Sequence, residues 1–209
     1  MNKNRHKVFK LSVTASIVFF VGALVACGFR QQAFAGHDTK SREPLRNYAV
    51  VWENKLTRSG LPYKDSGWQW LRDHGTNTIV TFRPQHDVDY EKFGFKRVLR
   101  IPLSGTQVPT DEQVNQFLAF IQDPANWPVD IHCSAGKDRT GMMAALARYA
   151  IDGWPMDKAL AESRLYRDGH DLPEKRVAWL ESWAANHKPG GYRSSNWKAS
   201  APAQSEGAR

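Results

Sequence analysis

The chain has 209 residues, of which 41% are hydrophobic, and a formal net charge of +8; this size and composition fit one globular domain with additional segments at its ends. The positive charge is confined to those ends. Residues 1–35 hold five Lys or Arg and no acid, and residues 188–209 hold four against one Glu. Residues 36–187 are therefore neutral overall, which argues against a nucleic-acid partner.

The N-terminal segment predicts export. The basic stretch "MNKNRHKVFK" precedes an apolar run from Leu11 to Phe29, which is typical of a signal peptide or a membrane anchor. Three fates are open. The "LVAC" sequence resembles a lipobox with Cys27 as its lipidation site, "AFA" at 33–35 fits signal-peptidase cleavage, and the run is nearly long enough to span a bilayer uncut. Cys27 is equally well explained as an apolar residue of the signal. Each fate predicts a periplasmic location, with or without a membrane tether.

Beyond this leader, apolar patterns predict strands that alternate with helices. Short apolar runs of the strand type lie at 47–55, 76–83, 96–103 and 127–132. Apolar residues at helical spacing lie at 65–75, 109–123, 138–153, 155–166 and 172–187. Between the first strand and the first helix, "RSGLP" at 58–62 predicts a turn, because Gly and Pro favour turns.

Local signals also predict two helix ends. Gly75 predicts the C-terminal stop of the first helix, and Thr110 with Gln113 predicts a capping box at the start of the second. The alternation predicts an α/β fold with a central, mostly parallel sheet of about four to five strands flanked by helices. We expect a leader over 1–35, a linker over 36–46, one domain over 47–187 and a disordered tail over 188–209.

The stretch "HCSAGKDRTG" at 132–141 runs from a predicted strand into a predicted helix, where binding sites form in parallel sheets. The residues between Cys133 and Arg139 are small or polar, so their backbone amides can turn inward as an anion-binding nest. Arg139 offers a planar fork for two phosphate oxygens. The same positive field lowers the pKa of the Cys133 thiol, which has no disulfide partner in the domain. The stretch therefore predicts a nucleophilic thiolate beneath a bound phosphate.

The pattern His-Cys-x5-Arg-Thr at 132–140 resembles the signature of the cysteine-based protein tyrosine phosphatase superfamily. Three more stretches, "RSGLP" (58–62), "GTNTIVTFR" (75–83) and "RIPLSG" (100–105), resemble landmarks of its atypical dual-specificity branch. That branch includes bacterial members and phosphatases that act on inositol pyrophosphates. The resemblance covers residues 47–185 and implies one α/β domain and metal-free hydrolysis through a phosphocysteine intermediate, with no cofactor.

The resemblance implies a role for each residue of the motif. Cys133 matches the nucleophile, Arg139 the phosphate-binding arginine, and Thr140 the hydroxyl that assists the sulfur as a leaving group. His132 matches the histidine that hydrogen-bonds the loop and helps to form the thiolate. The backbone cradle for the substrate is matched by Ser134, Ala135, Gly136, Lys137 and Asp138. Lys137 is either a grip for a second phosphate or a solvated loop lysine, and both interpretations stay open.

The sequence does not fix the general acid. Related phosphatases usually carry an aspartate on the loop after the preceding strand, but residues 101–110 contain no carboxylate. Asp138 is the first candidate and Asp111, at the start of a predicted helix, is the second. Asp87 and Asp89 are candidates on another loop. A phosphoanhydride, or another substrate with a good leaving group, needs no strong acid.

Two other functions fit the same pattern. A catalytically weak phosphate-binding module of this fold would keep the loop and lack the acid. A rhodanese-like sulfurtransferase also holds a cysteine in an anion loop, although its loop is usually shorter. For a phosphatase, the expected partner is a phosphorylated protein, an inositol phosphate or a lipid headgroup. No metal site is expected, because His74 and His86 lack ligand spacing, and the oligomeric state stays open.

Overall fold

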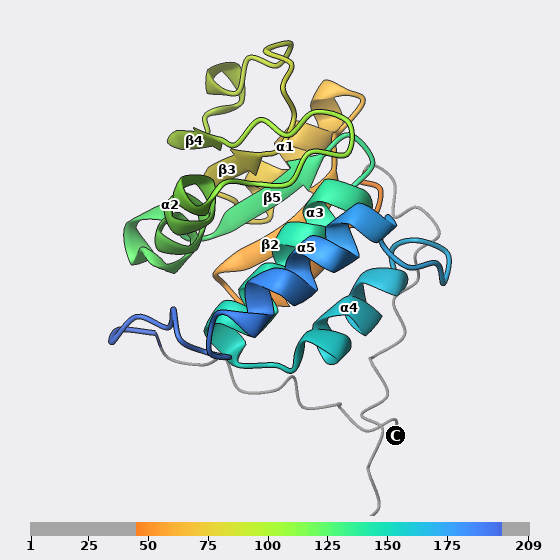
Figure 1. The fold of residues 1–209 in the computed structure, drawn as a ribbon. Coiled ribbons are helices and arrows are strands. Elements are labelled where there is room, and N and C mark those ends of the chain that lie inside the picture. Colours follow the sequence, from red (N-terminus) through yellow and green to blue (C-terminus); the bar gives the residue numbers. More distant parts are fainter. Residues whose placement is uncertain (1–44, 198–209) are drawn as a thin grey trace, which may run out of the picture. The chain divides into compact units, whose positions relative to one another are not determined.

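The computed structural model describes residues 45–197, in which five strands form one sheet with helices packed against it (Figure 1). The strands are β1 (Ala49–Trp52), β2 (Leu56–Gly60), β3 (Thr78–Thr81), β4 (Arg97–Arg100) and β5 (Val129–Cys133). The helices are α1 (Asp65–Asp73), α2 (Asp111–Gln122), α3 (Asp138–Ala147), α4 (Met156–Arg164) and α5 (Glu174–Ala185). Short 3-10 helices lie at Glu91–Phe93 and Pro124–Asn126, and a π-helical segment, Arg148–Asp152, directly follows α3.

The sheet is mostly parallel, in the order β1-β2-β5-β3-β4. β5 pairs in parallel with β2 and with β3, β3 pairs in parallel with β4, and only β1 runs antiparallel to its neighbour β2. The predicted α/β fold class is therefore confirmed. The last residue of β5, Cys133, pairs with Gly60 of β2, so the carboxyl ends of these strands meet where α/β sheets place their sites.

The two faces of the sheet bury different apolar clusters. Successive residues of a strand point to opposite faces, and in β3 Val80 joins one cluster while Ile79 joins the other. Val80 packs in the cluster that receives buried side chains from α2, α3, α4 and α5. Ile79 packs with Trp68 and Leu71 of α1. Four helices thus cover the face toward which Cys133 also points, and α1 covers the other.

The local helix signals are confirmed. Gly75 follows α1 with φ +89°, and its amide donates to the Arg72 carbonyl over 2.9 Å. At the start of α2 the Thr110 hydroxyl accepts from the Gln113 amide, and the Gln113 side chain accepts from the Thr110 amide. Both bonds join residues three apart in the sequence, which is why the sequence alone predicts them.

The prediction of a turn over 58–62 is wrong, because Arg58, Ser59 and Gly60 belong to β2. The hydroxyls of Thr57 and Ser59 donate to the buried carboxylate of Asp130 on β5, at 2.9 and 2.8 Å. Arg58, between them, points to the opposite face of the sheet and is 1% exposed. The chain turns only after Gly60, so "RSG" is a buried strand end.

Both predicted boundaries of the domain are also wrong. Leu45 lies in the predicted linker, yet it is 2% exposed and packs in the same apolar cluster as Trp68 and Leu71 of α1. Residues 188–197, assigned to a disordered tail, pack on the domain: the Gly190 amide donates to the Tyr149 carbonyl over 2.8 Å, and Trp197 lies edge-on to Trp52 with 4.5 Å between ring centroids. Burial of the Trp197 ring outweighs the Gly- and Ser-rich composition around it.

The predictions for the leader, for Cys27 and for residues 198–209 lie outside the described residues. Between Leu45 and Trp197, no helix has both the length and the apolar character needed to cross a bilayer. The proposed membrane tether therefore depends on the sequence of the leader.

Candidate active site

The candidate site is the loop that joins β5 to α3, which we call the phosphate loop (residues 133–139). Cys133 ends β5 and is 2% exposed, and α3 begins five residues later at Asp138. The turn between them needs a glycine: Gly136 has φ +71°, and a Cβ there would lie 2.6 Å from the Gly60 backbone nitrogen. The loop is thus packed directly against the end of β2.

Four successive carbonyl groups of this loop face outward, toward donors from the N-terminal part of the domain. The Leu61 amide donates to the carbonyls of Cys133 (2.9 Å) and Ser134 (3.1 Å). The remaining donors are side chains: Arg46 Nη2 to Ser134 O at 3.0 Å, Asn47 Nδ2 to Ala135 O at 2.8 Å, and Arg58 Nη2 to Gly136 O at 2.5 Å. We call Arg46, Asn47, Arg58 and the Leu61 amide the carbonyl clamp.

The carbonyl clamp determines where the amide hydrogens of the loop point. In a trans peptide the C=O and N–H groups point in opposite directions, so outward carbonyls leave the next amides directed inward. The Gly136 amide, for example, faces the Cys133 sulfur. The direction of the Gly136 amide agrees with the predicted nest for an anion.

The environment of Cys133 favours a thiolate. Burial alone would raise the pKa of the thiol, but the hydroxyl and amide of Thr140, the charge of Arg139 and the Gly136 amide together lower it below its ordinary value. The Thr140 hydroxyl is fully buried and has no hydrogen-bond partner among the described residues, so it is available to the sulfur. Cys133, Thr140 and Arg139 therefore lie together as the motif predicts.

Arg139 is fixed by its neighbours and still has donors to spare. Nη1 donates to the carbonyls of Phe82 and Leu103, both at 3.2 Å, and Nη2 donates to the Ser134 hydroxyl at 3.1 Å. These bonds use three of the five N–H groups of a guanidinium. Within the described residues, Nε and Nη2 each keep one N–H for a ligand, which is the number a bidentate phosphate contact needs.

His132 lies beneath the loop in its neutral form. Burial, the largest effect, and the nearby Arg83, Arg100 and Arg139 lower the pKa of the ring to about 3. Nδ1 lies 3.3 Å from the Cys133 carbonyl, which can only accept a hydrogen bond, so Nδ1 carries the proton. Nε2 then accepts from the Tyr90 hydroxyl at 3.0 Å. His132 therefore acts as a neutral link between the loop and the β3–β4 connection.

The candidate acids of the phosphate-loop region are paired with arginines. Asp138 forms an ion pair with Arg167, and its other oxygen lies 3.9 Å from Arg176 Nη1. Asp87 binds Arg83 through two bonds of 2.6 and 2.7 Å, and this contact is the main reason that its pKa lies below the ordinary value. The Arg83 contact favours the ionised carboxylate of Asp87, and Asp138 is engaged by Arg167, whereas a general acid must hold a proton and be free to donate it.

The other predicted residues of the site lie further toward the solvent. Asp111 is exposed in the first turn of α2, and Asp89 accepts backbone bonds from Glu91 and Lys92. Lys137 binds Asp168 at 2.8 Å, and its side chain is partly exposed. This exposed ion pair leaves both interpretations of Lys137 open, since the ammonium is neither freely solvated nor free of an anionic partner that a second phosphate would have to displace.

Sequence reasoning missed the carbonyl clamp. The sequence predicts a linker at Arg46, a strand at Asn47 and a turn at Arg58. The bonds from these side chains reach 78 to 88 residues along the chain, so no local pattern predicts them. The available signal was two arginines in a neutral stretch of sequence: Arg46 lies shortly before β1, and Arg58 lies in β2, which pairs with the motif-bearing β5.

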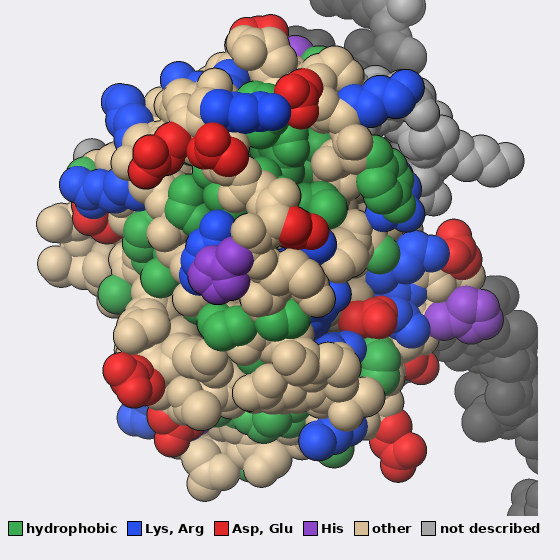
Figure 2. All heavy atoms as spheres, turned by 90° about the horizontal axis from the view of Figure 1, so that it is seen from above, with side chains coloured by type: hydrophobic (Ala, Val, Ile, Leu, Met, Phe, Trp, Pro, Cys, Tyr) green, Lys and Arg blue, Asp and Glu red, His purple; other side chains and the backbone are tan. Residues whose placement is uncertain are grey.

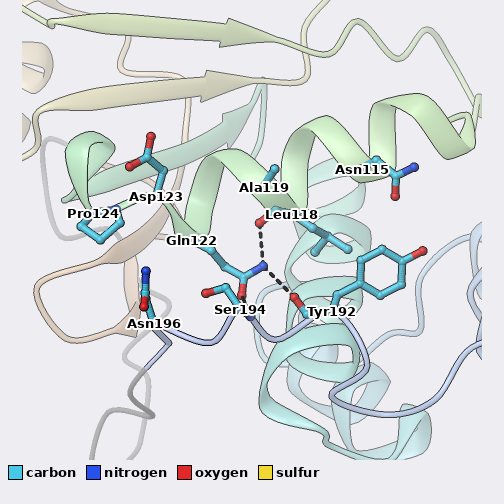
Figure 3. A pocket seen from close by; sticks show the side chains of 9 residues that line it. All are labelled: Asn115, Leu118, Ala119, Gln122, Asp123, Pro124, Tyr192, Ser194 and Asn196. Atoms are coloured by element: carbon cyan, nitrogen blue, oxygen red, sulfur yellow. Dashed lines mark hydrogen bonds between the residues drawn. The ribbon is translucent and has the colours of Figure 1, made fainter.

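A pocket of about 470 Å³ lies elsewhere, between α2 and residues 192–196 (Figure 3). None of its lining residues belongs to the phosphate loop. The side-chain nitrogen of Gln122, one of the lining residues, donates to the carbonyls of Leu118 (2.9 Å) and Tyr192 (3.0 Å). The side-chain oxygen of Gln122 accepts from the backbone amide of Ser194 (2.8 Å). Gln122 therefore uses its polar atoms to attach the C-terminal segment to α2.

The charges on the face in Figure 2 are mixed, with basic and acidic side chains adjacent to one another rather than collected into one positive area. The ion pairs of the phosphate-loop region follow the same pattern, since the cations Arg167, Lys137 and Arg83 each have a carboxylate partner. The positive potential at the site thus comes from the loop amides, from Arg139 and from the buried Arg58, none of which has a carboxylate partner among the described ion pairs.

Comparison with known families agrees with this geometry. Residues 37–178 match the model of the family described as "DSP-PTPase phosphatase fused to NAD+ Kinase". The chain belongs to this family. The match spans more than half of the chain and includes the whole phosphate loop, and the resemblance to atypical dual-specificity phosphatases is thereby confirmed.

Individual relatives place the chain in the same group. The dual specificity protein phosphatase TpbA of Pseudomonas aeruginosa is 31% identical over 107 residues, which cover 51% of this chain and 49% of TpbA. The inositol diphosphatase DSP4 of Arabidopsis thaliana is 28% identical over 127 residues, which cover 57% of this chain and 63% of DSP4. The crystal structure of P. aeruginosa TpbA superposes with a TM-score of 0.51 at 28% identity, covering 66% of this chain and 84% of that structure. The chain thus spans about half to two-thirds of the length of these two relatives.

Proposed function

We propose that the chain is a cysteine-dependent phosphatase that hydrolyses phosphomonoesters through a phosphocysteine intermediate. The observation that carries this proposal is the buried Cys133 thiol, whose pKa is lowered by Thr140, Arg139 and the Gly136 amide inside a loop of inward-facing amides. A thiolate at the base of an anion nest, beside a guanidinium with free donors, is an arrangement for attack on a bound phosphoryl group.

In the first step, a lone pair of the Cys133 sulfur forms the S–P bond. The P–O bond to the leaving group breaks, and its electron pair departs with the leaving oxygen. The loop amides and the free N–H groups of Arg139 hold the three other phosphoryl oxygens through the transition state. Because the carbonyl clamp already fixes the loop, and the bonds to Phe82, Leu103 and Ser134 fix Arg139, little reorganisation is needed when the charge develops.

In the second step, a water oxygen attacks the phosphorus, the S–P bond breaks and its electron pair returns to the sulfur. The proton of the water passes to a base or to solvent, and inorganic phosphate is released. The Thr140 hydroxyl, which is buried beside Cys133 and has no hydrogen-bond partner among the described residues, is available to stabilise the thiolate as it leaves. This is the role that the family motif implies for Thr140.

We further propose substrates whose leaving groups depart easily. Asp138 and Asp87 are bound to arginines as carboxylates, so proton donation to a poor leaving group is disfavoured. Phosphoanhydrides such as inositol pyrophosphates meet this condition best, and phosphotyrosine, whose phenol has a pKa of about 10, meets it better than an alkyl phosphate does. The names of the relatives support both classes, since TpbA is a dual specificity protein phosphatase and DSP4 an inositol diphosphatase. The leader supports a periplasmic location, either free or attached through the leader or a lipid on Cys27.

Hydrolysis of a chromogenic aryl phosphate by the purified chain, in the presence of EDTA, tests the proposal. We expect turnover by the wild type, loss of turnover to background in Cys133→Ser, and a phosphate adduct on the Cys133 peptide by mass spectrometry during turnover. Cys27→Ser, the matched control at the other cysteine, keeps full activity. Hydrolysis that survives in Cys133→Ser contradicts the mechanism.

The same preparation separates the alternatives. A phosphate-binding module would bind orthovanadate or inorganic phosphate through the loop and release no product from the aryl phosphate. A rhodanese-like enzyme would transfer sulfur from thiosulfate to cyanide and leave the phosphate ester intact. The lowered pKa of Cys133 and the buried Thr140 hydroxyl favour turnover over binding alone.

A further inference from the structure

Arg58 differs from the other cations around the site because it lies beneath the phosphate loop. It is 1% exposed, in β2, two residues before Gly60, which pairs with Cys133. Nη2 donates to the Gly136 carbonyl over 2.5 Å, and the guanidinium stacks on the Tyr166 ring at 3.5 Å from its centroid. A buried arginine held on two sides by one carbonyl and one aromatic face occupies a single geometry.

We propose that Arg58 is a positioning residue of the phosphate loop, which fixes the Gly136 peptide and supplies a buried positive charge behind it, so that the loop amides face the sulfur and the phosphate. This inference rests on the proposed phosphatase function. Arg58 does not touch the substrate in this scheme, and it acts through the loop backbone.

The chemistry follows from the polarity of the peptide group. A cation bound to a carbonyl oxygen withdraws electron density along the peptide, which makes the attached N–H more positive. Gly136 O is bound by Arg58, and the peptide that carries this oxygen has its N–H on Lys137, the last residue before α3. The charge of Arg58 thus adds to the partial positive charge of the helix N-terminus at the point where phosphate would bind.

The charges around Arg58 and around Cys133 determine how strongly the loss of Arg58 should change the pKa of the Cys133 thiol. Burial lowers the pKa of the Arg58 guanidinium, whereas Tyr166, Glu162 and the Cys133 thiolate raise it and Arg148 lowers it slightly. The charge of Cys133 is also felt by Arg83 after β3 and by Arg176 on α5, in addition to Arg139 on α3. The neutral His132 adds no charge. Arg58 is therefore one of several cations that stabilise the thiolate, and its removal should have a moderate effect on the thiol.

The test compares Arg58→Met and Arg58→Lys with the wild-type full chain. Thiolate formation is followed as the rate of iodoacetamide alkylation against pH, measured on the Cys133 peptide so that Cys27 does not contribute. We expect the pKa of the thiol to rise by about one unit in Arg58→Met, and kcat/KM for an aryl phosphate to fall about 100-fold. Arg58→Lys keeps the charge but not the planar fork, so its thiol titrates as in the wild type while kcat/KM falls about 10-fold.

Arg148→Met is the matched control, because Arg148 is a buried arginine of the same domain that binds Glu162 and Asp152 but no loop atom. It should lower the melting temperature and leave the alkylation profile unchanged. A wild-type alkylation profile and a wild-type kcat/KM in Arg58→Met overturn the inference. If Arg58→Met does not fold, Arg58→Lys decides, and wild-type kcat/KM in that variant overturns the inference.

The alkylation measurement needs no turnover. If the wild type does not hydrolyse the aryl phosphate, the proposed function fails, and the shift of the Cys133 pKa in Arg58→Met still tests the role of Arg58. If the wild type turns over and Arg58→Met is unchanged in both measurements, the inference about Arg58 fails alone.

Discussion

The phosphate loop has two sides that are held in different ways. On the side of the carbonyl clamp, the bonds from Arg46, Asn47 and Arg58 reach backbone oxygens, and Arg58 is almost fully buried. On the other side, Asp138 is paired with Arg167 at a position where its own side chain is 42% exposed. Lys137 and Asp168 likewise form an ion pair open to solvent.

This difference separates two tasks of a phosphatase. The bonds to the backbone oxygens are buried at Arg58 and partly buried at Arg46 and Asn47, so they are little screened by salt and preorganise the anion-binding half of the site. Exposed ion pairs contribute little to stability and rearrange easily. The structure therefore has a completed anion cradle, while the carboxylates on which protonation of the leaving group would depend are engaged with cations.

Apart from loss of the nucleophile, the largest effect is expected at Arg139, the side chain that we propose as the phosphate ligand. Arg139→Lys keeps the charge but loses both the bidentate contact and the bonds to Phe82 O and Leu103 O. We expect kcat/KM for an aryl phosphate to fall by about 100- to 1000-fold, on the order of 3 to 4 kcal/mol of transition-state binding. Competitive inhibition by orthovanadate, measured on the same samples, should weaken in parallel. Unchanged vanadate inhibition would show that Arg139 does not hold the phosphoryl oxygens.

A smaller effect is expected from adding a methyl group between the phosphate loop and β2. In Gly136→Ala the new Cβ would lie 2.6 to 2.8 Å from the backbone of Ser59 and Gly60, at a residue with φ +71°. Strain and overpacking together should lower the free energy of unfolding by about 3 kcal/mol, measured by urea titration.

Gly169→Ala is the control, because Gly169 has φ +86° and no described atom lies within 4 Å of the position that its new methyl group would take. It should cost only the conformational term, about 1 kcal/mol, in the same urea titration. Equal losses in the two variants would mean that the close packing of the loop on β2 adds no stability.

The distance along the chain between interacting residues explains which features the sequence predicts. The capping box of Thr110 and Gln113 and the stop at Gly75 depend on neighbours within four residues, and both are predicted correctly. The positions of Cys133, Arg139 and Thr140 follow from one contiguous motif on a strand-to-helix loop. The mostly parallel sheet also follows, because buried apolar runs alternate with amphipathic helices.

Features that depend on distant partners are missed for a physical reason. Gly and Pro around Arg58 indicate a turn, yet pairing with β5 and the stack on Tyr166 keep residues 58–60 in a strand. The composition of residues 188–197 indicates disorder, yet Trp197 gains more from burial against Trp52 and Trp127 than the segment loses in chain entropy. Local propensity decides only where no large tertiary contact opposes it.

The smallest effect on kcat/KM is expected at Asp138, on the side of the phosphate loop that carries the exposed ion pairs. Asp138→Asn should change kcat/KM for an aryl phosphate with an acidic phenol by less than about threefold, because that leaving group departs without a proton. Loss of the partly exposed pair with Arg167 should cost at most about 1 kcal/mol of stability.

A series of aryl phosphates with increasingly basic phenols sharpens this prediction. For an enzyme without a proton donor, log kcat/KM falls steeply along the series, and the slope is the same in the wild type, in Asp138→Asn and in the control Asp111→Asn, whose residue is exposed on α2. A shallow slope in the wild type that becomes steep only in Asp138→Asn would identify Asp138 as the general acid. In that case the Arg167 pair must open during turnover, and the two sides of the loop would differ in mobility rather than in chemical role.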